Sequence, residues 1–137
     1  MIDRAAQQLI RRMKLVLIVD DDPSMRWLLK AILRSTYKVV SKNNGLEAFS
    51  WLSVQNIPDL IICDIRMPIM GGLEFLENLA ISGLYKNTPI IMLTGFNDHG
   101  TRKRCLDLGA YDCLVKPFKP NELLDKIAHP FVSKMFL

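Results

Sequence analysis

Residues 15–23 read LVLIVDDDP, and most of the fold prediction rests on this stretch. Its five aliphatic residues, 15–19, are typical of a short strand that is buried on both faces. The run stops at three adjacent aspartates, and the last of them, Asp22, precedes Pro23. Aspartate is a favoured helix N-cap, and proline is favoured at the first helical position. The stretch therefore predicts a buried strand that leads directly into a helix.

The same alternation of strand and helix recurs along the chain. Short apolar runs predict four further strands, at residues 37–40, 60–63, 90–93 and 112–115. A helix is predicted after each of the five strands, mostly from apolar residues at helical spacing, at 23–33, 46–52, 73–80, 102–108 and 123–127. Five repeats of strand and helix predict an α/β fold, in which a parallel sheet has helices on both faces.

Length and composition predict one domain. The chain has 137 residues, of which half are hydrophobic and 23% are charged, so a disordered chain is excluded. We expect the folded domain at residues 14–128, an N-terminal extension at 1–13 and a short C-terminal tail at 129–137. No apolar run approaches the roughly 18 residues that cross a bilayer, and residues 1–12 lack the apolar block of a signal peptide. The expected location is cytoplasmic, without membrane contact.

The net charge of +4 raises the question of nucleic-acid binding. Basic residues are scattered from Arg4 to Lys134, and their single run is at residues 102–104. Solvated helix faces explain this distribution better than a binding groove does. We therefore expect no direct nucleic-acid contact by this chain.

The cysteines and tryptophans have structural explanations. Cys63, Cys105 and Cys113 form no CxxC pair, which argues against a disulfide framework or a zinc site. They are expected to be small core residues. Trp27 and Trp51 both fall in predicted helices and are expected to be packing residues.

Polar side chains stand where four of the five predicted strands end. The first strand is followed by the aspartates at 20–22, and three later strands end at Asp64, Thr94 and Lys116. Ligands of open parallel sheets bind outside the carboxyl ends of the strands. If these four strands are neighbours, the carboxylates, the hydroxyl and the ammonium group converge on one pocket.

The chemistry of this set indicates a phosphate ligand. Carboxylates that are brought together repel each other and need a cation, and oxygen ligands suit Mg²⁺. A lysine attracts phosphate as a point charge, and an aspartate can act as a nucleophile that forms an acyl phosphate. The set therefore predicts phosphoryl transfer to Asp64, with Asp20 and Asp21 holding Mg²⁺.

Four motifs at these strand ends resemble the receiver domain of two-component response regulators, the CheY-like family. They read VDDDPSMR at residues 19–26, DIRMP at 64–68, LTG at 93–95 and VKPF at 115–118. The similarity covers residues 14–128 and includes every motif in order. It implies a flavodoxin-like, doubly wound sheet of five parallel strands in the order 2-1-3-4-5.

The resemblance also implies site roles. Asp64 would be the phosphoacceptor, and a histidine kinase or a phosphotransfer protein would supply the phosphoryl group from a phosphohistidine. Asp20, Asp21 and the backbone carbonyl of Arg66 would hold Mg²⁺ together with Asp64. The implied function is a switch in phosphorelay signalling. Such a domain promotes its own phosphorylation and dephosphorylation, but it is not a metabolic enzyme.

The conformational switch departs from the family in one place. The resemblance implies that Lys116 would pair with the acyl phosphate and that Thr94 would couple its arrival to the helix at 102–108. Receivers usually carry tyrosine or phenylalanine three residues before this lysine, but here the place holds Cys113, with Tyr111 two residues earlier. By analogy with the family, two copies could pair through the helix at 102–108, the following strand and the last helix.

Three other functions compete with the phosphorylated switch. A pseudo-receiver would bind partners without phosphorylation; Cys113 favours it, and the intact Asp64, Thr94 and Lys116 argue against it. A metal-dependent phosphatase with an aspartyl nucleophile usually needs a second acid two residues after the nucleophile, where this chain has Arg66. A flavin-binding protein would need a hydroxyl-rich phosphate loop after the first strand, and none follows there.

Overall fold

The structure is a computed structural model that describes residues 2–95 and 99–135. Its five strands are β1 (Leu15–Val19), β2 (Lys38–Lys42), β3 (Leu60–Asp64), β4 (Ile90–Thr94) and β5 (Asp112–Val115). A helix follows each strand, and these helices are α2 (Pro23–Leu33), α3 (Gly45–Ser53), α4 (Gly72–Ser82), α5 (His99–Asp107) and α6 (Pro120–Met135). A further helix, α1 (Arg4–Arg12), precedes β1. The sheet is parallel with the order β2-β1-β3-β4-β5, which confirms the expected topology.

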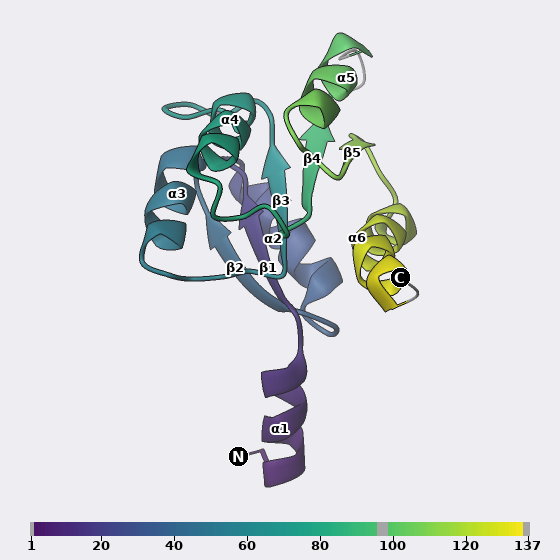
Figure 1. Cartoon of the computed structure of the whole chain (residues 1–137). Coiled ribbons are helices and arrows are strands. Elements are labelled where there is room, and N and C mark those ends of the chain that lie inside the picture. Colours follow the sequence, from purple (N-terminus) through teal and green to yellow (C-terminus); the bar gives the residue numbers. More distant parts are fainter. Residues whose placement is uncertain (1, 96–98, 136–137) are drawn as a thin grey trace.

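Helices cover both faces of the sheet (Figure 1). Helices α2 and α6 pack on one face, and α3, α4 and α5 pack on the other. Because successive residues of a strand point to opposite faces, β1 contributes to both cores. Val16 and Ile18 join the α2–α6 core, whereas Leu17 and Val19 join the core under α3, α4 and α5. This double burial is the physical reason for the unbroken aliphatic run.

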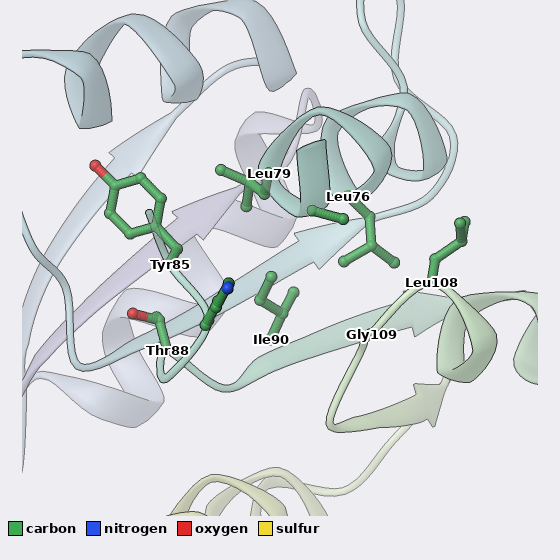
Figure 2. Close-up of a pocket in the computed structure, with 9 residues that line it drawn as sticks. Leu76, Leu79, Tyr85, Thr88, Ile90, Leu108 and Gly109 are labelled. Carbon is green, nitrogen blue, oxygen red and sulfur yellow. The ribbon is translucent and has the colours of Figure 1, made fainter. Parts of the chain in front are cut away.

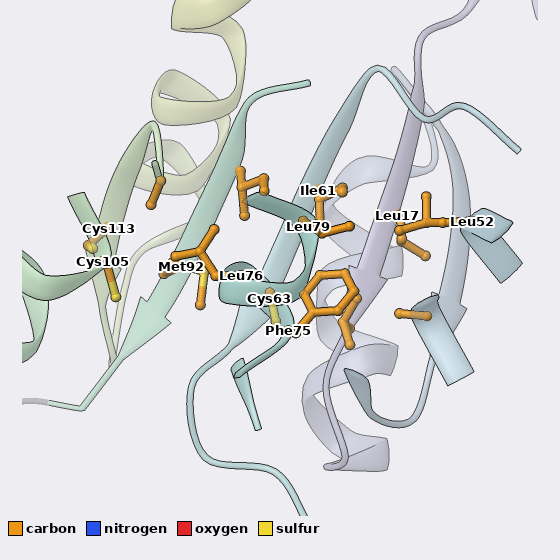
Figure 3. Close-up of a cluster of buried hydrophobic side chains, with 14 residues drawn as sticks. Leu17, Leu52, Ile61, Cys63, Phe75, Leu76, Leu79, Met92, Cys105 and Cys113 are labelled. Atoms are coloured by element: carbon orange, nitrogen blue, oxygen red, sulfur yellow. The ribbon is translucent and has the colours of Figure 1, made fainter. Parts of the chain in front are cut away.

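Figure 3 shows the core under α3, α4 and α5. Phe75 of α4 is fully buried in it, against the sheet. Cys63, Cys105 and Cys113 lie in the same cluster as buried free thiols, which confirms that they are core residues. Burial raises the pKa of Cys113 to about 12, so this thiol stays protonated at neutral pH. A buried, protonated thiol is a poor nucleophile, so its part in the fold is packing.

Several element boundaries differ from the sequence prediction. Strand β2 covers Lys38–Lys42 rather than 37–40, because the N–H of Tyr37 donates to the carbonyl of Leu33 at 2.9 Å, at the end of α2, and its side chain lies in the α2–α6 core. Its ring faces that of Phe131 on α6, at 6.1 Å between centroids. Helix α5 begins at His99 rather than at residue 102.

Helices also occupy parts of both expected extensions. Helix α1 lies within residues 1–13 and projects from the end of the domain at which β1 begins (Figure 1). Helix α6 continues through Pro130 to Met135, and Phe131 packs in the α2–α6 core. The domain limits of 14–128 stay a prediction. Within the part of the chain that the structure describes, no helix combines the length and apolar character that crossing a membrane requires.

The start of α4 packs directly against the end of β3. Gly72 begins α4, and a Cβ atom there would lie 2.2 Å from the backbone oxygen of Asp64 and 2.8 Å from Cα of Ile65. No side chain fits at such distances, so this close approach requires glycine. The N–H of Gly72 also donates a hydrogen bond of 2.9 Å to the carbonyl of Ile65. The backbone that carries Asp64 is therefore packed against, and hydrogen-bonded to, the start of α4.

Candidate functional site

Three aspartates converge at the carboxyl ends of β1 and β3. Asp20 directly follows β1, Asp21 comes next, and Asp64 is the last residue of β3. Because β1 and β3 are hydrogen-bonded neighbours, their ends lie side by side. One carboxylate oxygen of each aspartate lies within 4.8 Å of those of the other two. The structure thus brings together the acids that the sequence places at these two strand ends.

Lys116 approaches the same cluster from the end of β5. Its Nζ lies 2.9 Å from Oδ1 of Asp64 and 3.8 Å from Oδ2 of Asp20. Its backbone N–H donates to the carbonyl of Thr94 at 2.8 Å, and the Lys116–Pro117 peptide bond is cis. Since β4 lies between β3 and β5, the lysine side chain reaches across the end of β4. One ammonium group therefore faces the clustered carboxylates.

The remaining residues singled out in the sequence lie around this cluster. Thr94 ends β4 and is buried, with 3% of its surface exposed. Arg66 is exposed in the loop between β3 and α4. Asp22 has a different position: it is the N-cap of α2, and its carboxylate accepts a hydrogen bond of 2.9 Å from the N–H of Ser24. This capping confirms that α2 begins where the DDDP stretch predicts it.

Asp20 is a fully buried carboxylate with an unused acceptor. Its Oδ1 accepts from the N–H of Asp22 at 2.9 Å, whereas Oδ2 has no hydrogen-bond partner among the described residues. Burial raises the pKa of Asp20; the charges of Asp64 and Asp21 raise it further, and the Asp22 N–H and Lys116 lower it. An unsatisfied buried oxygen beside other carboxylates is unfavourable, and a cation would relieve it. The donor set therefore fits Mg²⁺, which prefers oxygen ligands.

Arg26 is a further residue of the site, and no role was expected for it from the sequence. Its Nη1 donates a hydrogen bond of 2.8 Å to the backbone carbonyl of Asp20, from α2. The N–H of Asp20 donates to the carbonyl of Lys42 at 3.1 Å. Both backbone groups of Asp20 are thus held. The arginine is part of the motif at 19–26, but its spacing alone does not show that the side chain turns back toward the strand.

Figure 2 shows a hollow that lies at the opposite end of the sheet. It has a volume of about 250 Å³ and is bordered mainly by α4, the segment after it, the start of β4 and the turn after α5. Ile90, the first residue of β4, lines it, whereas Thr94 at the carboxyl end of the same strand does not. No acidic residue is among its lining residues. This hollow is separate from the aspartate cluster.

The family model of the response regulator receiver domain matches residues 16–128. The chain belongs to this receiver-domain family. It is 38% identical over 116 residues to the two-component response regulator-like protein PRR37 of Oryza sativa subsp. indica, which covers 83% of this chain and 16% of that protein. It is 37% identical over 111 residues to the cyclic di-GMP phosphodiesterase response regulator RpfG of Xanthomonas campestris, which covers 79% of this chain and 29% of that protein. The chain thus spans a minor part of these relatives.

Solved receiver structures share the fold. The chemotaxis response regulator CheY4 of Vibrio cholerae matches with a TM-score of 0.78 and 35% identity, over 86% of this chain and 98% of that one. The receiver domain of a signal transduction histidine kinase from Syntrophus aciditrophicus matches with a TM-score of 0.80 and 35% identity, over 88% of this chain and 91% of that one. The expected CheY-like fold is therefore confirmed. A receiver domain is a signalling module, not a metabolic enzyme, and receivers interact with histidine kinases and phosphotransfer proteins.

The receiver has no aromatic side chain at the position that usually holds one. Cys113 occupies this place on β5 and is buried, with 2% of its surface exposed. Tyr111 lies just before β5, is 38% exposed, and its hydroxyl is hydrogen-bonded to Nδ1 of His129 on α6. The tyrosine ring therefore lies on the outer surface and does not fill the place of Cys113.

Proposed function

We propose that this receiver accepts a phosphoryl group on Asp64 from the phosphohistidine of a histidine kinase or phosphotransfer protein, in a Mg²⁺-dependent reaction in the cytoplasm. The domain then changes conformation as a switch in a phosphorelay. The observation that carries the proposal is the 2.9 Å ion pair between Lys116 Nζ and Asp64 Oδ1, beside the unpartnered Oδ2 of Asp20. Membership of the receiver family supports it.

In the proposed reaction, a carboxylate oxygen of Asp64 is the nucleophile. It forms a bond to phosphorus while the bond from phosphorus to the donor imidazole nitrogen breaks, and the imidazole leaves with the bonding electrons. The side chain of Asp64 is 12% exposed, so a donor can approach it from outside the sheet. Lys116 orients the carboxylate beforehand and remains as the positive charge beside the phosphoryl oxygens.

The proposed ligands of Mg²⁺ are the carboxylates of Asp20, Asp21 and Asp64 and the backbone carbonyl of Arg66. When bound, the ion neutralises the negative charge of the carboxylates and the phosphoryl oxygens. Asp20 is prepared for this role because its backbone is held on both sides and its Oδ2 is free to accept.

The proposed response starts at Thr94. This residue ends β4, and its carbonyl accepts from the N–H of Lys116, so it is linked to β5 at the site. Its hydroxyl would donate to a phosphoryl oxygen and carry the change to α5. Helices α5 and α6 and strand β5 would then form the surface through which two copies pair.

Mass spectrometry of the intact protein tests the proposal. The protein is incubated with a small phosphodonor and Mg²⁺, and a gain of one phosphoryl group is expected. The gain should be absent from Asp64→Asn and should fall when Mg²⁺ is chelated. Phosphorylation that persists in Asp64→Asn would place the acceptor elsewhere.

A second candidate function is a pseudo-receiver that binds partners without phosphorylation. It is favoured by the buried Cys113 at the usual aromatic position and by relatives whose names call them response regulator-like. It predicts no gain of mass with a small phosphodonor or with a cognate kinase. Partner binding that is the same for wild type and Asp64→Asn would then support it.

A further inference from the structure

A groove beside β2 holds an exposed indole and two cations. It runs between α2 and β2, has a volume of about 400 Å³ and is lined by Trp27, Lys30, Ala31, Arg34 and Val39. Three of these residues belong to α2 and a fourth, Arg34, is its C-cap. Together the four follow the spacing i, i+3, i+4, i+7. They therefore form one stripe along the helix, with the valine of β2 beside it.

The prediction that Trp27 is a packing residue is wrong. Its side chain is 71% exposed. Leu29 and Leu33 anchor α2 from the other side of the helix and are fully buried, so the helix docks without the indole. A tryptophan left in water retains apolar surface that association can still bury. Tryptophan and arginine are also the residue types most enriched at binding hot spots.

The groove is positively charged, because Lys30 and Arg34 line it. Neither Lys30 nor Arg34 forms a salt bridge with any residue that the structure describes. Their place at the end of α2 suits the helix dipole, which accounts for the charges but not for the indole beside them. Lys38 and Lys42 of β2 share the face of Val40, which is opposite to α2, so they add little to this groove.

We propose that this groove binds an acidic protein segment in which an apolar side chain stands beside one or two carboxylates. The apolar side chain would pack on Trp27, Ala31 and Val39, and the carboxylates would pair with Lys30 and Arg34. The binding surface is distinct from the phosphoacceptor cluster, because the stripe runs toward the C-terminal end of α2, whereas Asp20 precedes its N-terminal end.

The small number of cations in the groove favours an acidic protein segment over nucleic acid or an anionic membrane as the partner. Proteins that bind DNA typically neutralise about six to ten phosphates, and polybasic segments that bind anionic membranes carry about four to eight basic residues. This groove offers two cations, enough for one or two carboxylates. Its apolar lining of Trp27, Ala31 and Val39 also matches a side chain better than a sugar-phosphate backbone.

An NMR titration tests the proposal on the whole protein. The probe is a short synthetic peptide with a leucine flanked by glutamates, and a matched peptide with lysines in place of the glutamates is the control. We expect the indole N–H of Trp27 and the amide of Val39 to shift with the acidic peptide only. Trp27→Ala, and Lys30→Glu combined with Arg34→Glu, should each weaken binding about tenfold or more. Lys103→Glu, at an exposed lysine of α5, should leave binding within about twofold.

Three outcomes would overturn the proposal. These are the absence of shifts at the groove, an equal loss of binding in Lys103→Glu, and preferential binding of a single-stranded oligonucleotide or anionic vesicles through the same residues. Phosphorylation of the variants by a small phosphodonor is measured in parallel and should match wild type. A failure of the docking proposal is thereby distinguishable from a failure of the phosphoacceptor proposal.

Discussion

The ammonium group of Lys116 lies 2.9 Å from Oδ1 of Asp64 and 3.8 Å from Oδ2 of Asp20. A single cation at the end of β5 thus faces carboxylates at the ends of two other strands. Asp20 is fully buried and the side chain of Asp64 is 12% exposed, so solvent screens their mutual repulsion poorly. The lysine is therefore expected to stabilise the site before any metal or phosphoryl group arrives.

Replacing Lys116 by alanine should lower the free energy of unfolding, measured in urea without Mg²⁺, by about 1–3 kcal/mol. The reason is that two poorly hydrated carboxylates lose their counter-charge. Lys119→Ala removes an exposed lysine from the next loop and is the matched control, with an expected effect within about 0.5 kcal/mol. Equal effects of the two substitutions would show that the ion pair contributes nothing to stability.

Asp20→Asn should stabilise the metal-free protein at neutral pH by about 1 kcal/mol, because it removes a charge that burial disfavours. The pKa of Asp20 is raised, so the wild-type penalty is present above that pKa and disappears as the pH falls below it. The advantage of the variant should therefore vanish in acid. Thermal unfolding at a series of pH values measures this.

Mg²⁺ provides the complementary measurement on the same variant. It should raise the melting temperature of wild type, and raise that of Asp20→Asn much less, because binding to the folded state stabilises it. Asp22→Asn is the control, since asparagine caps a helix as well as aspartate does. If Asp20→Asn responds to Mg²⁺ as wild type does, Asp20 is not a ligand.

Asp112 should support stability except in acid. Burial alone would raise its pKa, but hydrogen bonds from Lys126 and the Cys113 N–H and the charges of Lys126 and Arg102 outweigh burial and lower it. A lowered pKa means that the stabilisation is complete above the ordinary value of 3.8 and is lost as the pH falls through the folded-state value. Asp112→Asn should cost about 1 kcal/mol at pH 7 and nothing at the acid end, by urea unfolding. A difference that does not change with pH would contradict this.

Gly72→Ala should destabilise the protein by about 3 kcal/mol or more, because its Cβ would meet the backbone of Asp64 at 2.2 Å. Moving that backbone should also reduce phosphorylation at Asp64. Gly100→Ala is the matched control, since a Cβ there meets nothing within 4 Å. In helix α5 it is expected to be neutral or to stabilise by about 0.5–1 kcal/mol. Urea unfolding compares the two, and similar losses would refute the close-approach argument.

Much of the fold and of the candidate site follows from local sequence. Residues 15–19 are aliphatic without interruption because both faces of β1 are covered, and this property is visible in the sequence. The capping aspartate and Pro23 mark the start of α2 for equally local reasons. Asp64 and Lys116 could be assigned to one site because parallel strands bring their carboxyl ends to the same edge of the sheet.

Contacts between distant segments account for what the sequence did not show. Tyr37 packs in the α2–α6 core beside Phe131, a residue far along the chain. Arg26 turns back to the carbonyl of Asp20, and Oδ2 of this aspartate is buried without a hydrogen-bond partner among the described residues. Periodicity cannot reveal such contacts, since they depend on side-chain directions that packing sets.

The alternation of strands and helices, the parallel sheet and the acidic cluster at its edge were readable from the sequence, because each depends on residue type and order along the chain. The exposure of Trp27 was not readable, because helical spacing shows which residues share a face but not which face docks. The place of positive charge on the surface is a second property that only the tertiary structure decided. Helical spacing puts Lys30 and Arg34 on the same stripe as Trp27, but only the packing of α2 beside β2 leaves this stripe exposed and lines it with Val39 as a groove.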